Sequence, residues 1–226
     1  MAIRIETGPM FSGKSGVLVE AIKRRIIGNQ KHGIDFLVFN FSGDTRYGTG
    51  ILSSHNKAQV RAIPVSFASD LLRYITKIDK RKNELVLKKQ FLRLRSIYID
   101  EAQFFDTALT RIVIKIDELF RIYNGHHSFE IVIGGLDTDF RGEPFGPMPE
   151  LMARADSVTK HVAVCSVCGE NNATKTQRLV NGKPASWHDP VVMVGAKELY
   201  TARCPMHHEV LQKPVFQLPG SLLSKL

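Results

Sequence analysis

Residues 8–15 read Gly-Pro-Met-Phe-Ser-Gly-Lys-Ser, the G-x-x-x-x-G-K-S pattern of a phosphate-binding loop, or P-loop. An apolar stretch at residues 2–5 precedes the loop and a helix-like stretch at residues 17–22 follows it, so the motif has the strand-to-helix setting it needs. Glycines let the backbone approach phosphates, and the N–H groups at the start of the helix face the anion. The stretch therefore predicts a nucleotide site; a chance glycine-rich turn is the alternative.

The residues of this loop have distinct expected roles. The Lys14 ammonium is a point charge for the outer phosphates, and the Ser15 hydroxyl is placed to ligate Mg²⁺. We predict that the whole loop contacts phosphate: Gly8, Pro9, Met10, Phe11, Ser12, Gly13, Lys14 and Ser15.

Strands and helices alternate around the loop. Short apolar runs predict strands at residues 3–5, 36–39, 96–99 and 130–133, and helical stretches lie at about 14–29, 68–77 and 106–123. Such alternation predicts an α/β fold with a mainly parallel, P-loop (recA-like) sheet and helices on both faces. After about residue 160 short polar stretches predominate. We expect a P-loop nucleotide-binding domain at 1–160, a small second module at 161–213 and a loose tail at 214–226.

The formal charge of +9 is concentrated in one segment. Residues 77–95 hold eight Lys and Arg against Asp79 and Glu84, a net charge of +6. A basic solvated helix or hairpin is the simpler interpretation; an acidic partner or nucleic acid is the other. The 226 residues contain no run as long as a membrane span and no signal peptide, so we expect a cytoplasmic protein with no membrane partner.

Two carboxylates end the predicted strand at 96–99. In P-loop enzymes an aspartate at this place holds Mg²⁺, so Asp100 is the second predicted Mg²⁺ ligand beside Ser15. Glu101 would then lie near the γ-phosphate, where a general base could take a proton from an acceptor hydroxyl. Acidic residues at a helix N-terminus are the structural alternative.

Residues 100–103, Asp-Glu-Ala-Gln, also spell a helicase-type motif. The competing functional hypothesis is therefore a nucleic-acid-stimulated P-loop ATPase that uses the basic 77–95 segment. Such motors generally need two recA-like halves, and this chain has room for one.

The three cysteines fit a metal site better than a disulfide framework. Cys165 and Cys168 form a C-x-x-C pair, and Cys204 with His207 forms a C-x-x-H pair. Four sulfur and nitrogen ligands suit a closed, structural Zn²⁺ site, with His208 as the competing fourth ligand. Free thiols or a redox C-x-x-C pair are the alternatives.

Taken together, these motifs resemble the thymidine kinases of the cytosolic, zinc-containing type. The segments that carry the resemblance are residues 8–15, 44–47 (Asp-Thr-Arg-Tyr), 99–105 (Ile-Asp-Glu-Ala-Gln-Phe-Phe), 135–146 (Gly-Leu-Asp-Thr-Asp-Phe-Arg-Gly-Glu-Pro-Phe-Gly) and the cysteines above. The resemblance implies ATP- and Mg²⁺-dependent phosphorylation of the 5′-hydroxyl of thymidine or deoxyuridine. It makes Glu101 the base and adds Asp44, Arg46 and Gln103 to the phosphate site.

The resemblance also implies the acceptor site and the regulation. The implied nucleoside pocket contains Met10, Phe104, Leu136, Phe140 and Phe145, covered by a zinc-tethered loop with Val194, Gly195 and Tyr200. Members of the family associate as homotetramers and are inhibited by dTTP, the triphosphate end product, and nucleic acid is not expected as a partner.

Overall fold

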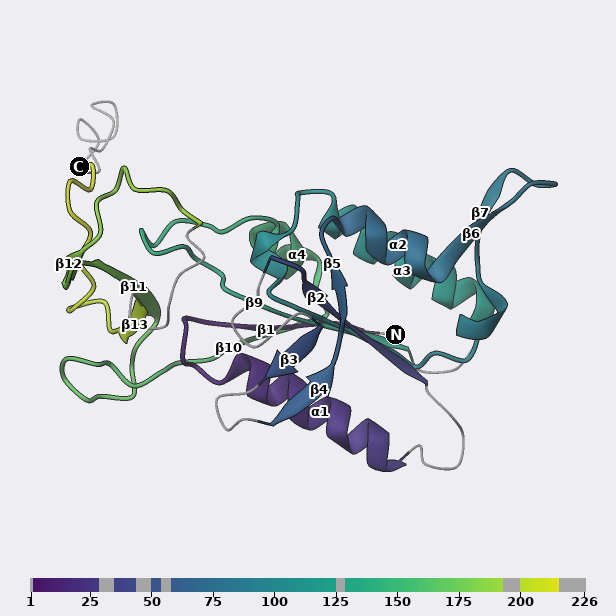
Figure 1. The fold of residues 1–226 in the computed structure, drawn as a ribbon, viewed down its shortest axis with the longest axis horizontal. Helices are drawn as coiled ribbons and strands as arrows, with labels where there is room; N and C mark the ends of the chain where they lie inside the picture. Colours follow the sequence, from purple (N-terminus) through teal and green to yellow (C-terminus); the bar gives the residue numbers. More distant parts are fainter. Residues whose placement is uncertain are drawn as a thin grey trace, which may run out of the picture.

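The computed structural model describes residues 2–28, 35–43, 50–53, 58–124, 129–192 and 200–215. Within this part of the chain a six-stranded sheet with strand order β10-β1-β9-β8-β2-β5 forms the centre of the molecule (Figure 1). Every strand pairing in it is parallel, which confirms the α/β prediction. The strands are β1 (Ala2–Thr7), β2 (Phe36–Phe41), β5 (Ile63–Val65), β8 (Ser96–Asp100), β9 (Glu130–Gly135) and β10 (Ser157–Lys160).

Helices cover both faces of this sheet (Figure 1). On one face α1 (Lys14–Gly28) packs together with the two-stranded ribbon of β3 (Ile51–Ser53) and β4 (Gln59–Arg61). On the other face lie α2 (Ala68–Ile75), α3 (Leu109–Asn124) and α4 (Met148–Arg154). The helices expected at about 14–29, 68–77 and 106–123 are therefore present with slightly shorter bounds.

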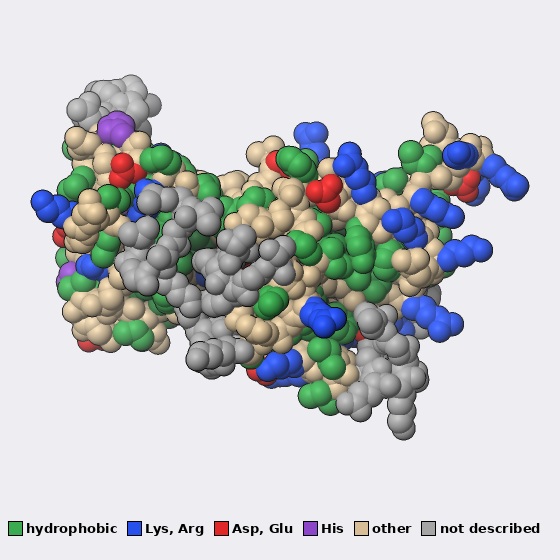
Figure 2. All heavy atoms as spheres, in the orientation of Figure 1, with side chains coloured by type: hydrophobic (Ala, Val, Ile, Leu, Met, Phe, Trp, Pro, Cys, Tyr) green, Lys and Arg blue, Asp and Glu red, His purple; other side chains and the backbone are tan. Residues whose placement is uncertain are grey.

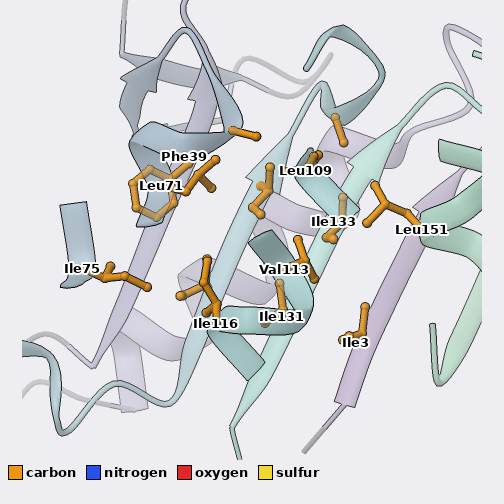
Figure 3. Close-up of a cluster of buried hydrophobic side chains, with 14 of the residues drawn as sticks. Ile3, Phe39, Leu71, Ile75, Leu109, Val113, Ile116, Ile131, Ile133 and Leu151 are labelled. Atoms are coloured by element: carbon orange, nitrogen blue, oxygen red, sulfur yellow. The ribbon is translucent and has the colours of Figure 1, made fainter. Parts of the chain in front are cut away.

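The larger core lies between the sheet and α2, α3 and α4 (Figure 3). Leu109, Val113, Ile116 and Phe120 of α3 are all buried, and their spacing places them on one side of the helix. They face strand residues such as Ile131 and Ile133, whereas Val132, between them, points to the α1 side. Because parallel strands are buried on both faces, their residues are apolar almost without alternation.

The basic 77–95 segment contains a hairpin, which is one of the two forms, helix or hairpin, that the sequence predicted. It consists of β6 (Thr76–Asp79) and β7 (Glu84–Leu87), followed by the short 3₁₀ helix η1 (Lys89–Phe91). Lys and Arg side chains project from its end of the molecule (Figure 2). The hairpin follows α2 and leads into the start of β8, so it lies at the amino ends of the strands. The P-loop follows the carboxyl end of β1, so it lies at the opposite ends of the parallel strands.

A small second sheet follows the main one in the chain. It contains β11 (Lys175–Val180), β12 (Lys183–Pro184) and β13 (Tyr200–Arg203), in the order β12-β11-β13. The segment between the two predicted ligand pairs is therefore partly antiparallel sheet, where we expected a loop. Among the described residues of this module, the buried apolar cluster consists of alanines and cysteines, namely Ala163, Cys165, Ala173, Ala202 and Cys204. So small a core buries little apolar surface, which is the usual situation of modules that need a metal.

Among the described residues, no helix has the length and apolar character to cross a membrane. Four predicted site residues lie outside the described part of the chain: Asp44, Arg46, Val194 and Gly195. The same holds for residues 216–226 of the expected tail.

Candidate active site at the carboxyl ends of β1, β8 and β9

The P-loop joins β1 to α1 through two glycines with positive φ angles, Gly8 (137°) and Gly13 (86°). A Cβ atom at Gly8 would collide with the backbone oxygen of His161, which follows β10. The Lys14 ammonium donates to the Pro9 carbonyl oxygen at 2.6 Å, so it lies over the loop. Backbone N–H groups at the start of α1 and this cation together form a site for a polyanion.

Asp100 meets the P-loop helix across the sheet. Its side chain is buried and hydrogen-bonded to the Ser15 hydroxyl, which brings together the two predicted Mg²⁺ ligands. Burial raises the pKa of the Asp100 carboxyl to about 7, and the charge of Glu101 adds to the rise. The Lys14 charge and the Ser15 hydrogen bond act in the opposite direction. A carboxylate and a hydroxyl are hard oxygen ligands, so the pair fits Mg²⁺.

Two glycines at the end of β9 allow Asp100 of β8 to come close to α1. Strand β9 lies between β1 and β8 in the sheet, so any side chain there would stand in the way. A Cβ atom at Gly134 would lie 2.9 Å from Asp100 Oδ1 and 3.1 Å from Leu18 Cδ2. A Cβ atom at Gly135 would lie 2.8 Å from Met148 Sδ and 2.9 Å from Gln103 Oε1. Neither position has room for a larger residue without a shift of these neighbours.

Glu101 turns the chain out of β8 in the left-handed conformation, with φ 54°. The 3₁₀ helix η2 (Ala102–Phe104) follows at once and carries Gln103, whose Nε2 donates to Glu101 Oε2 at 2.5 Å. The Glu101 side chain is half-buried and close enough to Asp100 for its charge to act on that carboxyl. It can thus accept a proton next to the phosphate site.

The 135–146 segment is a compact loop organised by a buried carboxylate. Asp139 is 2% exposed, accepts backbone N–H bonds from Arg141 and Glu143, and pairs with the Arg141 guanidinium at 2.7 Å. The loop closes at Phe145, whose N–H donates to the Asp137 carbonyl oxygen at 3.1 Å. This bonding keeps an aromatic-rich loop rigid beside η2.

Three aromatic rings meet where this loop contacts η2. The Phe104 and Phe145 ring centroids are 5.6 Å apart in an edge-to-face arrangement, and the Phe41 ring lies 5.6 Å from Phe104. Leu136 and Phe140 are buried behind them, and the Arg178 guanidinium lies 5.0 Å from the Phe140 ring centroid. Partly exposed phenylalanine rings can stack on a planar base.

The four predicted zinc ligands form one cluster. The sulfur atoms of Cys165, Cys168 and Cys204 and a His207 ring nitrogen all lie within 4.8 Å of one another. His207 Nδ1 is 3.7 Å from Cys165 Sγ and 3.1 Å from Cys204 Sγ. Ligand atoms around tetrahedral zinc are separated by roughly 3.3–3.8 Å, given metal–ligand distances of about 2.0–2.3 Å. Of the two candidate histidines, His207 has the position that fits a fourth ligand, whereas His208 turns away to the Phe140 carbonyl.

The acidity of Cys165 also suits a metal ligand. Burial alone raises the pKa of this thiol, but hydrogen bonds from the backbone of Cys168, Cys204 and Val167 outweigh that effect and lower the pKa to about 5. A thiolate is the form that binds zinc. The donor set and its spacing thus fit a closed structural site.

The zinc module also touches the P-loop. The Met10 N–H donates to Thr176 Oγ1 of β11 at 3.0 Å, and Tyr200 begins the neighbouring strand β13. Sequence analysis did not identify Thr176, Phe41 or Arg178 as parts of this region. Phe41 ends a strand at the carboxyl edge, a position that could have indicated it, whereas nothing in the local sequence marks Thr176 or Arg178.

A comparison of the chain with protein-family models supplies the remaining observation. The model described as "Thymidine kinase" matches residues 1–208, which include the P-loop, the 135–146 loop and the whole Cys3His cluster.

Proposed function

Because the chain belongs to the thymidine kinase family, we propose that ATP is its phosphoryl donor and that the 5′-hydroxyl of thymidine is the acceptor. Deoxyuridine is the second proposed acceptor, and the proposed role is the salvage of pyrimidine deoxynucleosides. The observation that supports this most directly is the bridge from Glu101 through Gln103 to the backbone of Leu136. It joins the acidic end of β8 to the aromatic loop within one hydrogen-bonded unit.

The donor half of the reaction is assigned to the P-loop. Backbone N–H groups and the Lys14 ammonium would hold the β- and γ-phosphates, and charge neutralisation there favours transfer. Ser15 and Asp100 would hold Mg²⁺, which would neutralise the negative charge of the phosphates. Asp44 and Arg46 stay predicted members of this half.

The acceptor half is assigned to Glu101 and the aromatic group. The Glu101 carboxylate takes the proton of the 5′-hydroxyl as that oxygen forms its bond to the γ-phosphorus. The bond between the γ-phosphorus and the β–γ bridging oxygen breaks in the same in-line step, and ADP leaves with the bonding electrons. Phe104 and Phe145 hold the pyrimidine, with Met10 and Tyr200 at the edge of the site and Val194 and Gly195 in the covering segment.

Zinc is proposed as a structural cross-link with no chemical step of its own. Cys165, Cys168, Cys204 and His207 would hold it, and β11 and β13 are thereby kept against the P-loop and the 135–146 loop. Homotetramer formation, inhibition by dTTP and a cytoplasmic location stay predictions from the family resemblance.

A nucleoside-panel assay tests the proposed function. The protein is incubated with Mg·ATP and each nucleoside, and the monophosphate is measured with and without added DNA. We expect product only with thymidine and deoxyuridine, and no effect of DNA. Glu101→Gln should reduce transfer to a small residual rate while ATP binding is retained, whereas Glu118→Gln, which replaces an exposed carboxylate on α3, serves as the control. ATP turnover that ignores thymidine and responds to DNA would overturn the proposal.

A further inference from the structure

Gln103 connects two loops that the chain brings together from distant places. Its side chain is 2% exposed, and both of its polar atoms are bonded. Nε2 donates to Glu101 Oε2 at 2.5 Å, and Oε1 accepts the Leu136 backbone N–H at 2.9 Å. The same amide thus contacts the proposed base and the first residues of the aromatic loop.

The chemistry of the two partners determines the orientation of this amide. A backbone N–H can only donate, so the amide oxygen must face Leu136. An ionised carboxylate can only accept, so the NH₂ group must face Glu101. A flipped amide would place its oxygen against the Glu101 carboxylate and its NH₂ group against the Leu136 N–H, so one orientation of the Gln103 amide is strongly favoured.

Gln103 is closely surrounded by neighbouring backbone. A Cβ atom at Gly135 would lie 2.9 Å from Gln103 Oε1, and a Cβ atom at Gly146 would collide with the Gln103 backbone oxygen. Gly146 has a φ angle of 52°, so the chain there follows a path adapted to this close approach. A move of the amide toward a phosphate would break both hydrogen bonds and leave buried polar atoms unpaired, which is costly.

We infer that Gln103 is a positioning residue for the Glu101 carboxylate, and that it acts through this bridge and not as a phosphate ligand. The bridge makes the position of the base depend on the 135–146 loop, since any shift of Leu136 is transmitted through the amide. This inference rests on the proposed function, in which Glu101 is the base.

Two variants separate the two ends of the bridge. Gln103→Glu keeps an oxygen that can accept from Leu136 but places a carboxylate against Glu101. Gln103→Met removes both bonds with little change of volume. Thr76→Val is the matched control for the loss of a buried side-chain hydrogen bond elsewhere, because Thr76 Oγ1 donates to the Leu72 carbonyl at 2.6 Å, far from the site.

For each variant the kcat and the KM for ATP and for thymidine are measured, together with the melting temperature. We expect both Gln103 variants to lose kcat on the order of 10²-fold with an unchanged KM for ATP, as a small displacement of a catalytic group can cost that much. Thr76→Val should lower only the melting temperature. An unchanged kcat in Gln103→Glu would overturn the inference, and so would a raised KM for ATP.

A double-mutant cycle distinguishes failure of this inference from failure of the proposed function. If Gln103 acts through Glu101, Gln103→Met should cost nothing more in a Glu101→Gln background. Multiplied losses would instead show an independent role and contradict the inference. Full activity of Glu101→Gln alone would remove the proposed base itself. The reversed pair Glu101→Gln/Gln103→Glu should recover the melting temperature but not kcat, because the bond is restored and the base is not.

Discussion

His208 Nε2 lies 2.8 Å from the carbonyl oxygen of Phe140, so the residue after the predicted zinc ligand His207 is hydrogen-bonded to the 135–146 loop. His207 faces the three sulfur atoms, whereas its neighbour faces the 135–146 segment. Lys213 adds a second contact, from its Nζ to the Arg141 carbonyl at 3.0 Å. His208 and Lys213 therefore support the 135–146 loop, which carries three of the predicted nucleoside contacts, Leu136, Phe140 and Phe145.

Replacement of His208 by leucine should weaken thymidine binding without loss of zinc. One hydrogen bond of about 1 kcal/mol corresponds to about a fivefold rise in the KM for thymidine. Steady-state kinetics and a zinc determination on the same sample check this. His188→Leu changes an exposed histidine of the same module and should leave KM unchanged. If His208→Leu lost its zinc, the distinction between the two adjacent histidines would be wrong.

Removal of zinc should disable the acceptor site before the donor site. In Cys165→Ser, or after chelation, the small alanine and cysteine core cannot hold β11 against β13, because the metal supplies the folding energy of such modules. We expect thymidine turnover to fall by more than about tenfold, while far-UV circular dichroism and ATP binding persist, since the main core is a separate cluster. Val167→Ala, between two ligands, is the control. Full activity without bound zinc contradicts this prediction.

Gly134→Ala should damage the metal end of the site. The new Cβ atom would lie 2.9 Å from Asp100 Oδ1, so the carboxylate must shift from the position in which it bonds Ser15. We expect a higher KM for Mg·ATP and a stability loss of about 1–3 kcal/mol, typical of overpacking. Gly28→Ala, where no atom lies within 4 Å of the added Cβ, is the matched control. Denaturant unfolding and Mg²⁺ titrations of the rate measure the two effects.

Asp100 makes the stability of the Mg²⁺- and nucleotide-free protein depend on pH. Its folded-state pKa, raised to about 7, exceeds the ordinary value of 3.8, so the unfolded chain releases this proton first as the pH rises. The stabilising contribution is complete below pH 4 and is lost toward pH 7, at up to about 1.4 kcal/mol per pH unit.

Asp100→Asn cannot titrate and should therefore lack this part of the slope. The unfolding free energy of Asp100→Asn minus that of the original protein should grow between pH 4 and pH 7 and then level off. We expect this variant to be inactive as a kinase. Urea unfolding at several pH values measures the slope. Glu118→Gln, on the surface of α3, should leave the slope unchanged; equal slopes for Asp100→Asn and the original chain would contradict the assignment.

Neutralisation of the hairpin tip tests the competing ATPase hypothesis. The variant Lys80→Gln/Arg81→Gln/Lys82→Gln removes three exposed positive charges. They lie at the amino ends of the strands, whereas the P-loop lies at the carboxyl ends. Surface changes of this kind seldom exceed about 0.5 kcal/mol, so kcat and KM should stay within about twofold. A large loss of ATP turnover, or a DNA response that this variant abolishes, would favour the ATPase.

Much of the candidate site was predictable from local sequence. The P-loop, the acidic pair at 100–101 and the cysteine pairs follow from short spacings, because each depends on one turn of the chain. The choice of His207 over His208 was not predictable, since both histidines follow Cys204 at usable spacings. Only the folded positions of their rings separate a zinc ligand from a partner of Phe140.

The sequence by itself determined the class of fold, the phosphate loop and the three cysteines of the predicted zinc site, because periodicity and motif spacing act over a few residues. The tertiary structure alone decided which distant groups meet. Gln103 reaches Leu136, Thr176 reaches Met10, and Gly134 admits Asp100, all through the order in which parallel strands align their carboxyl ends. Strand order depends on the packing of whole helices and sheets, and no local pattern encodes it.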